Sequence, residues 1–443
     1  MSALRQRATK ARATSPAAAR PTEVSAAAVG GAEDVPSGFG WRAGLAVLLG
    51  VRLLSAGVLM ITDCDETFNY WEPTHYTLYG WGFQTWEYSP AYALRSYFFL
   101  LPHSVAVSAL HTATGSKLAA FYGARALQGL ASWHLERRFC EAIATRFGTT
   151  TATATLWLLA GSAGMFHAST AFLPSSFTML AVLGIWTAWL RDAYGPAIII
   201  AVYTILLVWP FAVLLYVPLG LTALFAPDFG LLKVLRWGIV SSLLLGGVDM
   251  AYNTMFYGKP LLASWEIFYY NVLQDNGGPE LYGTEPASFY AVNLALNFNG
   301  ALVLAAVLPA TLPLASLFGR ANAKKQTLCV TGCKAQLVYL APLYVWFCFY
   351  SSLPHKEERF LAPCYPLLCA AAAASLGGST CTHAVLISAR GAHVAVAPVL
   401  GRLLDAYSHS LVLDWQVLWC TLGLFCLSSA VPADPARRPL CRW

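Results

Sequence analysis

Long apolar stretches separated by short polar segments dominate the pattern of this chain. A transmembrane helix needs about 20 apolar residues. Stretches of about that length lie near residues 41–61, 117–135, 153–172, 175–191, 237–256, 288–313, 335–353, 360–377 and 411–431. The stretch 195–226 is either one long span or two short spans broken at Pro210 and Pro218. The pattern predicts an all-α polytopic membrane protein with roughly ten crossings.

Composition agrees with this class. Hydrophobic residues make up 57% of the chain and charged residues 11%, and the mean hydropathy is +0.54. Soluble globular proteins are only about 45–50% apolar. The net charge of +6 does not indicate a nucleic-acid partner, because the basic residues are scattered among short loops and form no single basic face.

The scattered basic residues instead predict the topology, since Lys and Arg accumulate in cytosolic loops. This rule places residues 1–40, a basic segment poor in large apolar groups, on the cytosolic side as a disordered tail. A transit peptide is the alternative interpretation of that segment. The rule also requires 91–113 to be an interfacial or re-entrant segment. The segments on the opposite, exoplasmic side are then 62–90, 257–287 and 354–360.

The densest acidic cluster lies in the first of these exoplasmic segments, which begins Asp63-Cys64-Asp65-Glu66 and continues to Glu72. A sugar hydroxyl that attacks an activated anomeric carbon needs a carboxylate to accept its proton. Aromatic residues follow closely, as in a sugar-stacking surface or a belt at the membrane interface. The alternative is an ordinary solvated loop in which Asp63 caps a short helix.

A second charged cluster, His355-Lys356-Glu357-Glu358-Arg359, lies between two apolar spans. Charge of this density beside a membrane indicates a functional site. The three cations are suited to a phosphate group, and the two glutamates to sugar hydroxyls or to positioning the cations. The alternative is a polar turn whose charges pair with one another.

Several motifs together resemble one family. They are DCDETFNYWEPTHYTLYGWGFQTWEYSPAY at 63–92, FLPSSF at 172–177, ELYGTEP at 280–286, NFN at 297–299 and HKEERF at 355–360. In order and spacing they resemble the α-1,2-mannosyltransferases of asparagine-linked glycosylation, which belong to glycosyltransferase family 22 of the GT-C superfamily. The first-loop and HKEERF motifs are the most specific.

The resemblance implies a GT-C membrane domain over residues 41–376, in the endoplasmic reticulum membrane, with its active site in the lumen. It also implies the substrates: dolichyl phosphate mannose as donor and a dolichyl-pyrophosphate-linked oligosaccharide as acceptor. Mannose would be transferred with inversion at the anomeric carbon. These lipid substrates and the surrounding membrane lipids are the expected partners.

The resemblance also assigns roles to residues. Asp65 is the expected base, Asp63 is its rival, and Glu66 orients the acceptor or the base. The residues expected to bind the donor phosphate are His355, Lys356 and Arg359. Those expected to bind substrate are Trp71, Glu72, Tyr282, Glu285, Glu357 and Glu358. No cofactor or metal is expected, because the donor carries a single phosphate; a metal bridged by Asp63 and Asp65 is the alternative.

The chain departs from the family beyond Leu376. Residues 377–443 are divergent and contain one further predicted span, and the polar lumenal domain of the family is not recognisable in them. A catalytically inactive, shortened form of the transferase is therefore one alternative. A cation-coupled transporter that uses the same acids is another, although such a site belongs near the middle of the membrane and not at its rim.

Overall fold

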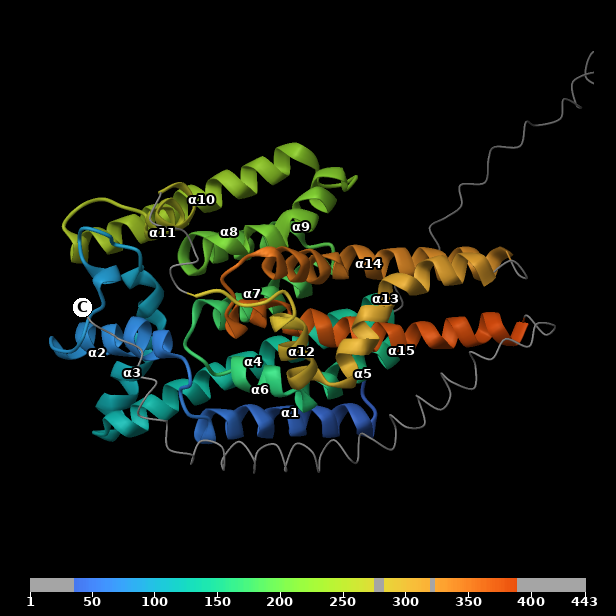
Figure 1. Ribbon diagram of the computed structural model, residues 1–443, viewed down its shortest axis with the longest axis horizontal. Helices are drawn as coiled ribbons and strands as arrows, with labels where there is room; N and C mark the ends of the chain where they lie inside the picture. The colour runs from blue at the N-terminus through green and yellow to red at the C-terminus, as the bar shows by residue number, and fades with distance from the viewer. Residues whose placement is uncertain (1–35, 275–282, 319–322, 389–443) are drawn as a thin grey trace, which may run out of the picture. The chain divides into compact units, whose positions relative to one another are not determined.

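The structure is a computed structural model that describes residues 36–274, 283–318 and 323–388. Throughout these ranges the regular elements are helices and there is no β-strand (Figure 1), which confirms the all-α class. The first helices are α1 (Phe39–Val58), α2 (Glu72–Tyr79), α3 (Tyr97–Thr114), α4 (Lys117–Phe147), α5 (Thr149–Gly161), α6 (Ala163–Ala168) and α7 (Pro174–Trp189). The later ones are α8 (Tyr194–Tyr203), α9 (Val213–Phe225), α10 (Gly230–Tyr257), α11 (Ala263–Phe268), α12 (Phe289–Phe298), α13 (Gly300–Phe318), α14 (Ala323–Ser352) and α15 (Tyr365–Ser388).

Short helical turns of other types connect these helices. The 3₁₀ turns are η2 (Trp86–Tyr88), η4 (Pro210–Ala212) and η8 (Glu358–Cys364). The π-helical turns are η1 (Glu66–Trp71), η3 (Thr204–Val208) and η5 (Tyr269–Leu273). The predicted loop 62–90 is thus largely helical, because η1 runs directly into α2. Its acids lie on a rigid element and not on a free loop.

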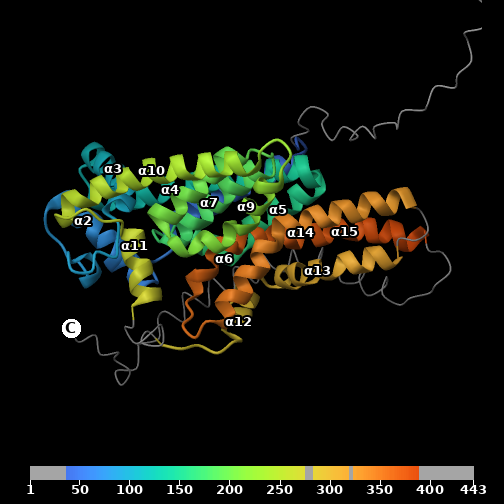
Figure 2. The same cartoon turned by 90° about the horizontal axis from the view of Figure 1, so that it is seen from above.

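The segment 91–113 forms a helix that pairs with the next one. The Ser96 hydroxyl accepts the first free N–H groups of α3, and Gly115, at φ 67°, ends it in the left-handed conformation that glycine tolerates. Ser116 caps α4 at once. α3 and α4 consequently pack against each other as a helical hairpin at the end of the molecule that also holds α2 (Figures 1 and 2).

The stretch 195–226 is broken at only one of its two prolines. Trp209 is extended, with φ −155° and ψ 103°, because the ring of Pro210 disfavours a helical conformation in the preceding residue. Pro218 lies inside α9 without ending it. The chain therefore forms two short helices here, and the break leaves Trp209 and its neighbours free to line a cavity.

The predicted span 288–313 is not one straight helix. It is broken at Asn299, so that α12 and α13 lie at 115° to each other. Asn299 has φ 47°, a conformation that asparagine adopts more readily than most residues. Asn297, two residues earlier, donates from Nδ2 to Glu358 at 2.9 Å, which ties the end of α12 to the HKEERF segment.

Three helical stretches of the described chain are long and apolar enough to cross a membrane: α1, α10 and Glu358–Leu376, and the bent pair α12–α13 would make a fourth. The predicted total of roughly ten crossings therefore stays a prediction, and the span 411–431 lies outside the described residues.

One charged contact inside the bundle joins three of its helices. Arg52 on α1 and Glu136 on α4 are both fully buried and lie 2.6 Å apart. Arg52 also donates to the carbonyl oxygen of Leu159 at the end of α5. A buried charge must be paired in a membrane, so this contact fixes how α1, α4 and α5 pack.

Candidate active site

An open cavity of about 420 Å³ lies where the first acidic segment meets the HKEERF segment. Its walls come from segments far apart in the sequence, including η1, η3, η5 and the residues beside them. These are the π-helical turns of the described chain, and such turns are frequent at functional sites. The polar and charged side chains of the lining include Cys64, Asp65, Tyr70, Glu87, Arg95, Ser96, Ser175, Ser264, Tyr270, Asn271, His355, Glu357 and Arg359.

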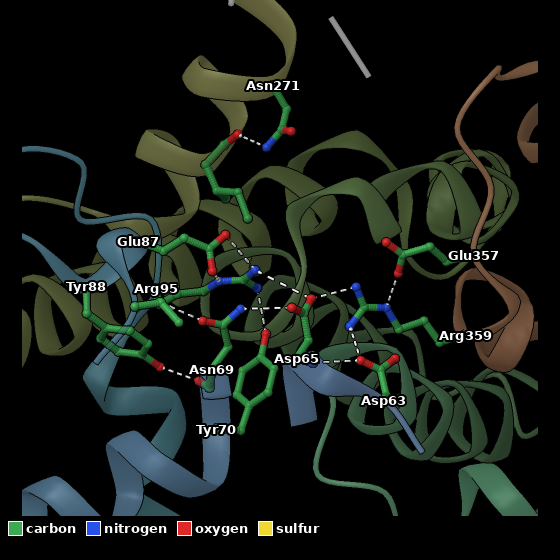
Figure 3. A network of polar contacts seen from close by, with 12 residues as sticks. Asp63, Asp65, Asn69, Tyr70, Glu87, Tyr88, Arg95, Asn271, Glu357 and Arg359 are labelled. Carbon is green, nitrogen blue, oxygen red and sulfur yellow. Dashed lines mark hydrogen bonds and ion pairs between the residues drawn. The ribbon is translucent and has the colours of Figure 1, made fainter. Parts of the chain in front are cut away.

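Asp65 lies between two arginines (Figure 3). Its Oδ2 accepts a hydrogen bond from Nη2 of Arg359 at 2.6 Å and lies 3.9 Å from Nη2 of Arg95. Its Oδ1 accepts from the side-chain amide of Asn69 at 3.1 Å. Asn69 is four residues ahead on the same helical segment, so η1 itself holds the carboxylate in place.

Asp63 is engaged in a different way. Its Oδ1 accepts both from the backbone N–H of Asp65 at 2.9 Å and from Nη1 of Arg359 at 3.3 Å. It is absent from the cavity lining. Of the two aspartates, Asp65 is therefore the one whose carboxylate faces the space that a substrate can enter.

The pKa values of the two aspartates are shifted in opposite directions. Burial outweighs the nearby Arg359 and raises the pKa of Asp63. Burial acts on Asp65 as well, but the guanidinium groups of Arg359 and Arg95 more than offset it and lower the pKa of Asp65. The lowered pKa keeps Asp65 in the ionised form that a general base needs, but it also makes Asp65 a weak base while both arginines lie beside it.

The predicted second cluster contributes three residues to the cavity, namely His355, Glu357 and Arg359. Glu357 accepts from Nε of Arg359 and pairs with Nε2 of His355 at 3.0 Å. Arg359 thus contacts the carboxylates of Asp63, Asp65 and Glu357 together. The two motifs, nearly 300 residues apart, form one ionic network.

Arg95 is a cavity residue that sequence reasoning missed. It forms a two-pronged contact with Glu87, at 3.1 and 2.9 Å, and donates from Nη1 to the Tyr70 hydroxyl at 2.6 Å. The sequence does mark Arg95 as unusual, because it is the one charged residue of the apolar segment 91–113. Charge counting used that segment only for topology.

The backbone beside Arg95 is clamped by α10. The Tyr257 hydroxyl donates to the carbonyl oxygen of Arg95 at 2.6 Å. Asn253 accepts the N–H of Tyr97 at 2.9 Å, and Asp249 accepts from the Ser96 hydroxyl at 2.6 Å. These polar contacts lie on one face of a helix that is otherwise largely exposed, so they fix the position from which Arg95 enters the cavity.

Glu66 and Trp71 point away from the cavity. Glu66 is 4% exposed, and its Oε1 accepts from the Trp71 indole at 3.1 Å and from the backbone N–H of Phe172 at 3.0 Å. Burial raises the pKa of Glu66, against the effect of these hydrogen bonds. The structure thus gives Glu66 contacts that attach η1 to the FLPSSF segment, and no place beside Asp65 in the cavity lining.

Lys356 is likewise turned inward. It is 6% exposed, and its ammonium group donates to the carbonyl oxygens of Glu285 and Leu353. It does not line the cavity. The structure places it where it joins Glu285 to Leu353 at the end of α14, outside the cavity lining.

The remaining predicted substrate-binding residues are dispersed. The side chain of Glu72 accepts the backbone N–H of Phe83 at 3.2 Å, and that of Glu358 accepts from Asn297. Glu285 is exposed and joins its N–H to the carbonyl oxygen of Pro354 at 3.0 Å. None of these three lines the cavity. Tyr282 lies outside the described residues.

Asp63, Cys64 and Asp65 offer ligand atoms within 4.8 Å of one another, so the alternative of a bridging metal can be tested against their surroundings. Both carboxylates already contact Arg359, and a cation between them would have to displace that guanidinium. Burial, with the charges of Asp65 and Asp63, raises the pKa of the Cys64 thiol, which disfavours the thiolate that binds metals. The donor set fits the ion pair better than a metal.

Sequence comparison identifies the family to which this arrangement belongs. The sequence profile of the Alg9-like mannosyltransferase family matches residues 44–431. The chain belongs to this family. The profile covers both charged motifs and continues beyond Leu376.

Named relatives agree with this membership. The chain is 40% identical over 353 residues to the alpha-1,2-mannosyltransferase ALG9 of Mus musculus, and this match covers 79% of this chain and 56% of the mouse protein. It is 37% identical over 350 residues to ALG9 of Arabidopsis thaliana (78% and 57%) and 32% identical over 322 residues to ALG9 of Saccharomyces cerevisiae (70% and 54%). The chain thus spans a little over half the length of these relatives. The transporter alternative receives no support from them.

Among solved structures, ArnT from Cupriavidus metallidurans bound to undecaprenyl phosphate is similar, with a TM-score of 0.54 and 17% identity. The match covers 77% of this chain and 60% of that one. At this identity the likeness concerns the fold alone.

Proposed function

We propose that this member of the family transfers a mannosyl group from dolichyl phosphate mannose to a dolichyl-pyrophosphate-linked oligosaccharide, forming an α-1,2 linkage. The observation that carries the proposal is the position of the Asp65 carboxylate, which faces the cavity beside the cations of Arg359 and Arg95. The naming of the relatives as alpha-1,2-mannosyltransferases supports the sugar and the linkage.

In the proposed reaction a hydroxyl group of the acceptor attacks the anomeric carbon of mannose. The bond between that carbon and the phosphate oxygen breaks, and its electron pair stays on dolichyl phosphate. The hydroxyl proton passes to Asp65, which acts as the general base. Attack from the face opposite the phosphate inverts the anomeric centre.

Charge on the departing phosphate requires preorganised cations. Arg359 is suited to this role because it lines the cavity and its planar group can bind two phosphate oxygens at once. His355 lies on the same wall. Since Arg359 contacts Asp65 at 2.6 Å, we infer that the donor phosphate draws Arg359 away from Asp65. Departure of this cation raises the basicity of the carboxylate when the donor is in place.

We further propose that the reaction takes place at the lumenal face of the endoplasmic reticulum membrane and needs no cofactor. The helices able to cross a membrane support the membrane location. The single phosphate of the donor and the arginines of the cavity together meet the need for charge stabilisation without a metal.

The test is to express the chain in cells that lack the related transferase and to analyse their lipid-linked oligosaccharides. The wild type should convert the under-mannosylated intermediate, and D65N should not. D63N is the matched control, since Asp63 is two residues away and shares Arg359 but does not line the cavity. Normal transfer by D65N, with loss in D63N, would assign the base to Asp63 and refute our assignment. Accumulation of the intermediate with well-expressed wild type would refute the proposed activity.

A further inference from the structure

Three aromatic side chains meet at the rim of the cavity. Trp86, at the start of η2, lies edge-on to Tyr92 with their ring centroids 4.8 Å apart. Tyr270 on η5 completes the group, at 5.6 Å from Trp86 and 6.2 Å from Tyr92. Two of the rings come from the first acidic segment and the third from a segment about 180 residues later. We call these three residues the aromatic rim.

The aromatic rim is open to the outside although its rings touch one another. Trp86 is 46% exposed and Tyr92 45% exposed. An aromatic cluster that served only to pack would bury these faces. Tyr270 lines the cavity, so the exposed surface of the rim is continuous with the cavity wall.

Polar residues of the cavity follow directly after two members of the rim. Glu87 follows Trp86, and Asn271 follows Tyr270, and both line the cavity. Apolar ring faces beside carboxylate and amide groups are the chemistry that recognises a sugar, whose C–H face packs on the ring while its hydroxyls form hydrogen bonds.

The volume of the cavity limits how much of the acceptor glycan it can hold. A volume of about 420 Å³ lies toward the small end of the roughly 300–1,000 Å³ usual for pockets that enclose a drug-sized molecule. The mannosyl phosphate of the donor and the accepting sugar take up much of this space. An acceptor with several sugars must therefore extend out of the cavity. One route out of the cavity leads past the exposed rings of Trp86 and Tyr92.

We propose that Trp86, Tyr92 and Tyr270 form a binding subsite for the glycan of the acceptor, in which hexose rings beyond the accepting sugar stack on the exposed aromatic faces. The inference rests on the proposed mannosyltransferase function and adds to it the place where the acceptor glycan lies. Its competitor is a role at the membrane interface, where exposed Trp and Tyr are also enriched.

The experiment measures mannose transfer by the full chain in membranes, with two acceptors. The complete acceptor is the under-mannosylated lipid-linked oligosaccharide with its whole glycan. The short acceptor is a lipid-linked glycan cut back to the accepting sugar and its core. W86A should raise KM for the complete acceptor about tenfold, leave KM for the donor unchanged, and leave KM for the short acceptor within twofold. W86F, which keeps an aromatic face, should restore most of the loss. W81A is the matched control, because Trp81 is 64% exposed in the same segment but its ring contacts His75 and Lys117 and not the rim.

Equal rises in KM for both acceptors, or no rise for either, would overturn the proposal. Brominated lipids quench tryptophan fluorescence, and the share of the quenching that is lost in W86F belongs to Trp86. Quenching of Trp86 together with unchanged KM values would assign the rim to the membrane interface instead. Binding of a soluble oligomannose glycan with two GlcNAc residues, followed by tryptophan fluorescence, gives a readout without catalysis. If the wild type binds this glycan, W86A weakens the binding, and the protein transfers no mannose, then the proposed function is refuted and the glycan subsite is supported. If the wild type transfers mannose but does not bind the glycan, the subsite alone is refuted.

Discussion

Replacement of Arg359 by methionine is the perturbation whose effect follows most directly from the structure. The guanidinium group contacts the carboxylates of Asp63, Asp65 and Glu357. Methionine keeps an unbranched apolar stem but is shorter and removes the charge. The variant therefore leaves three carboxylates close together without the cation that joins them.

The magnitude follows from the burial of the groups. Removing one partner of a fully buried ion pair costs about 3–5 kcal/mol, because it leaves an uncompensated charge. Here the Arg359 side chain is 19% exposed and its three partners are 26–32% exposed, so water relieves part of that cost. We expect R359M to lower the free energy of unfolding by about 2–3 kcal/mol at pH 7.

The pH dependence gives a sharper test than the magnitude. In the wild type, Arg359 and Arg95 hold the pKa of Asp65 below its ordinary value despite burial. Ionised Asp65 therefore stabilises the folded state, and that contribution is lost only as the pH falls through its lowered pKa. In R359M only Arg95 and Asn69 oppose the effect of burial on Asp65, so its pKa rises, and the pKa of Asp63, already raised in the wild type, rises further. The variant then gains stability as the pH falls from 7 to 5, because protonation removes the repulsion.

The assay is unfolding of the full chain in detergent micelles by increasing SDS, followed by tryptophan fluorescence at pH 7 and pH 5. The stability deficit of R359M should shrink by about 1 kcal/mol or more between these values. In the double variant R359M/D65N the deficit should be at least about 1 kcal/mol smaller than the sum of the single effects. A deficit that is the same at both pH values, together with additive single effects, would refute the reasoning that this cation holds the acids.

The same structure predicts the behaviour of three further side chains. K356M should lower the free energy of unfolding by about 2 kcal/mol in the same SDS titration, because the ammonium group donates to the carbonyl of Glu285. KM for the donor should not change, and a large rise in this KM would show that Lys356 binds the donor phosphate. E66Q should unfold like the wild type, since an amide oxygen can still accept the Phe172 N–H, whereas E66A should lose about 2 kcal/mol; equal losses would contradict this contact. N253A should cost about 1–2 kcal/mol and lower kcat/KM, because Asn253 accepts the N–H of Tyr97 and so positions the backbone beside Arg95; an unchanged kcat/KM would contradict this role of α10.

Much of the fold was predictable because hydrophobic runs and helix signals are local. Apolar runs correctly placed α1, α7 and the centre of α10. The break at Pro210 was predicted as one of two, because proline restricts its preceding residue wherever it lies. The bend at Asn299 was missed, since it is set by one backbone conformation within an otherwise apolar run.

The site was predictable in part. Asp65 and Arg359 come from the two densest charged motifs, and the structure brings them to 2.6 Å. Arg95 was missed because a single arginine beside an apolar helix gives no sign of what it will face. Lys356 was predicted to bind the donor phosphate and Glu66 to orient the acceptor or the base, but tertiary packing buries both side chains in contacts with the backbone of other segments.

By itself, the sequence determined the chemistry available to this protein: an all-helical membrane chain with one acidic and one mixed-charge motif, and a resemblance to a family of mannosyltransferases. Only the tertiary structure decided which members of those motifs meet. The reason is that spacing along a helix fixes the side of the helix on which a residue lies, whereas packing decides whether that side faces a neighbour or a cavity. Asp65 faces the cavity and Glu66, the next residue, faces Phe172, a difference that composition and charge do not encode.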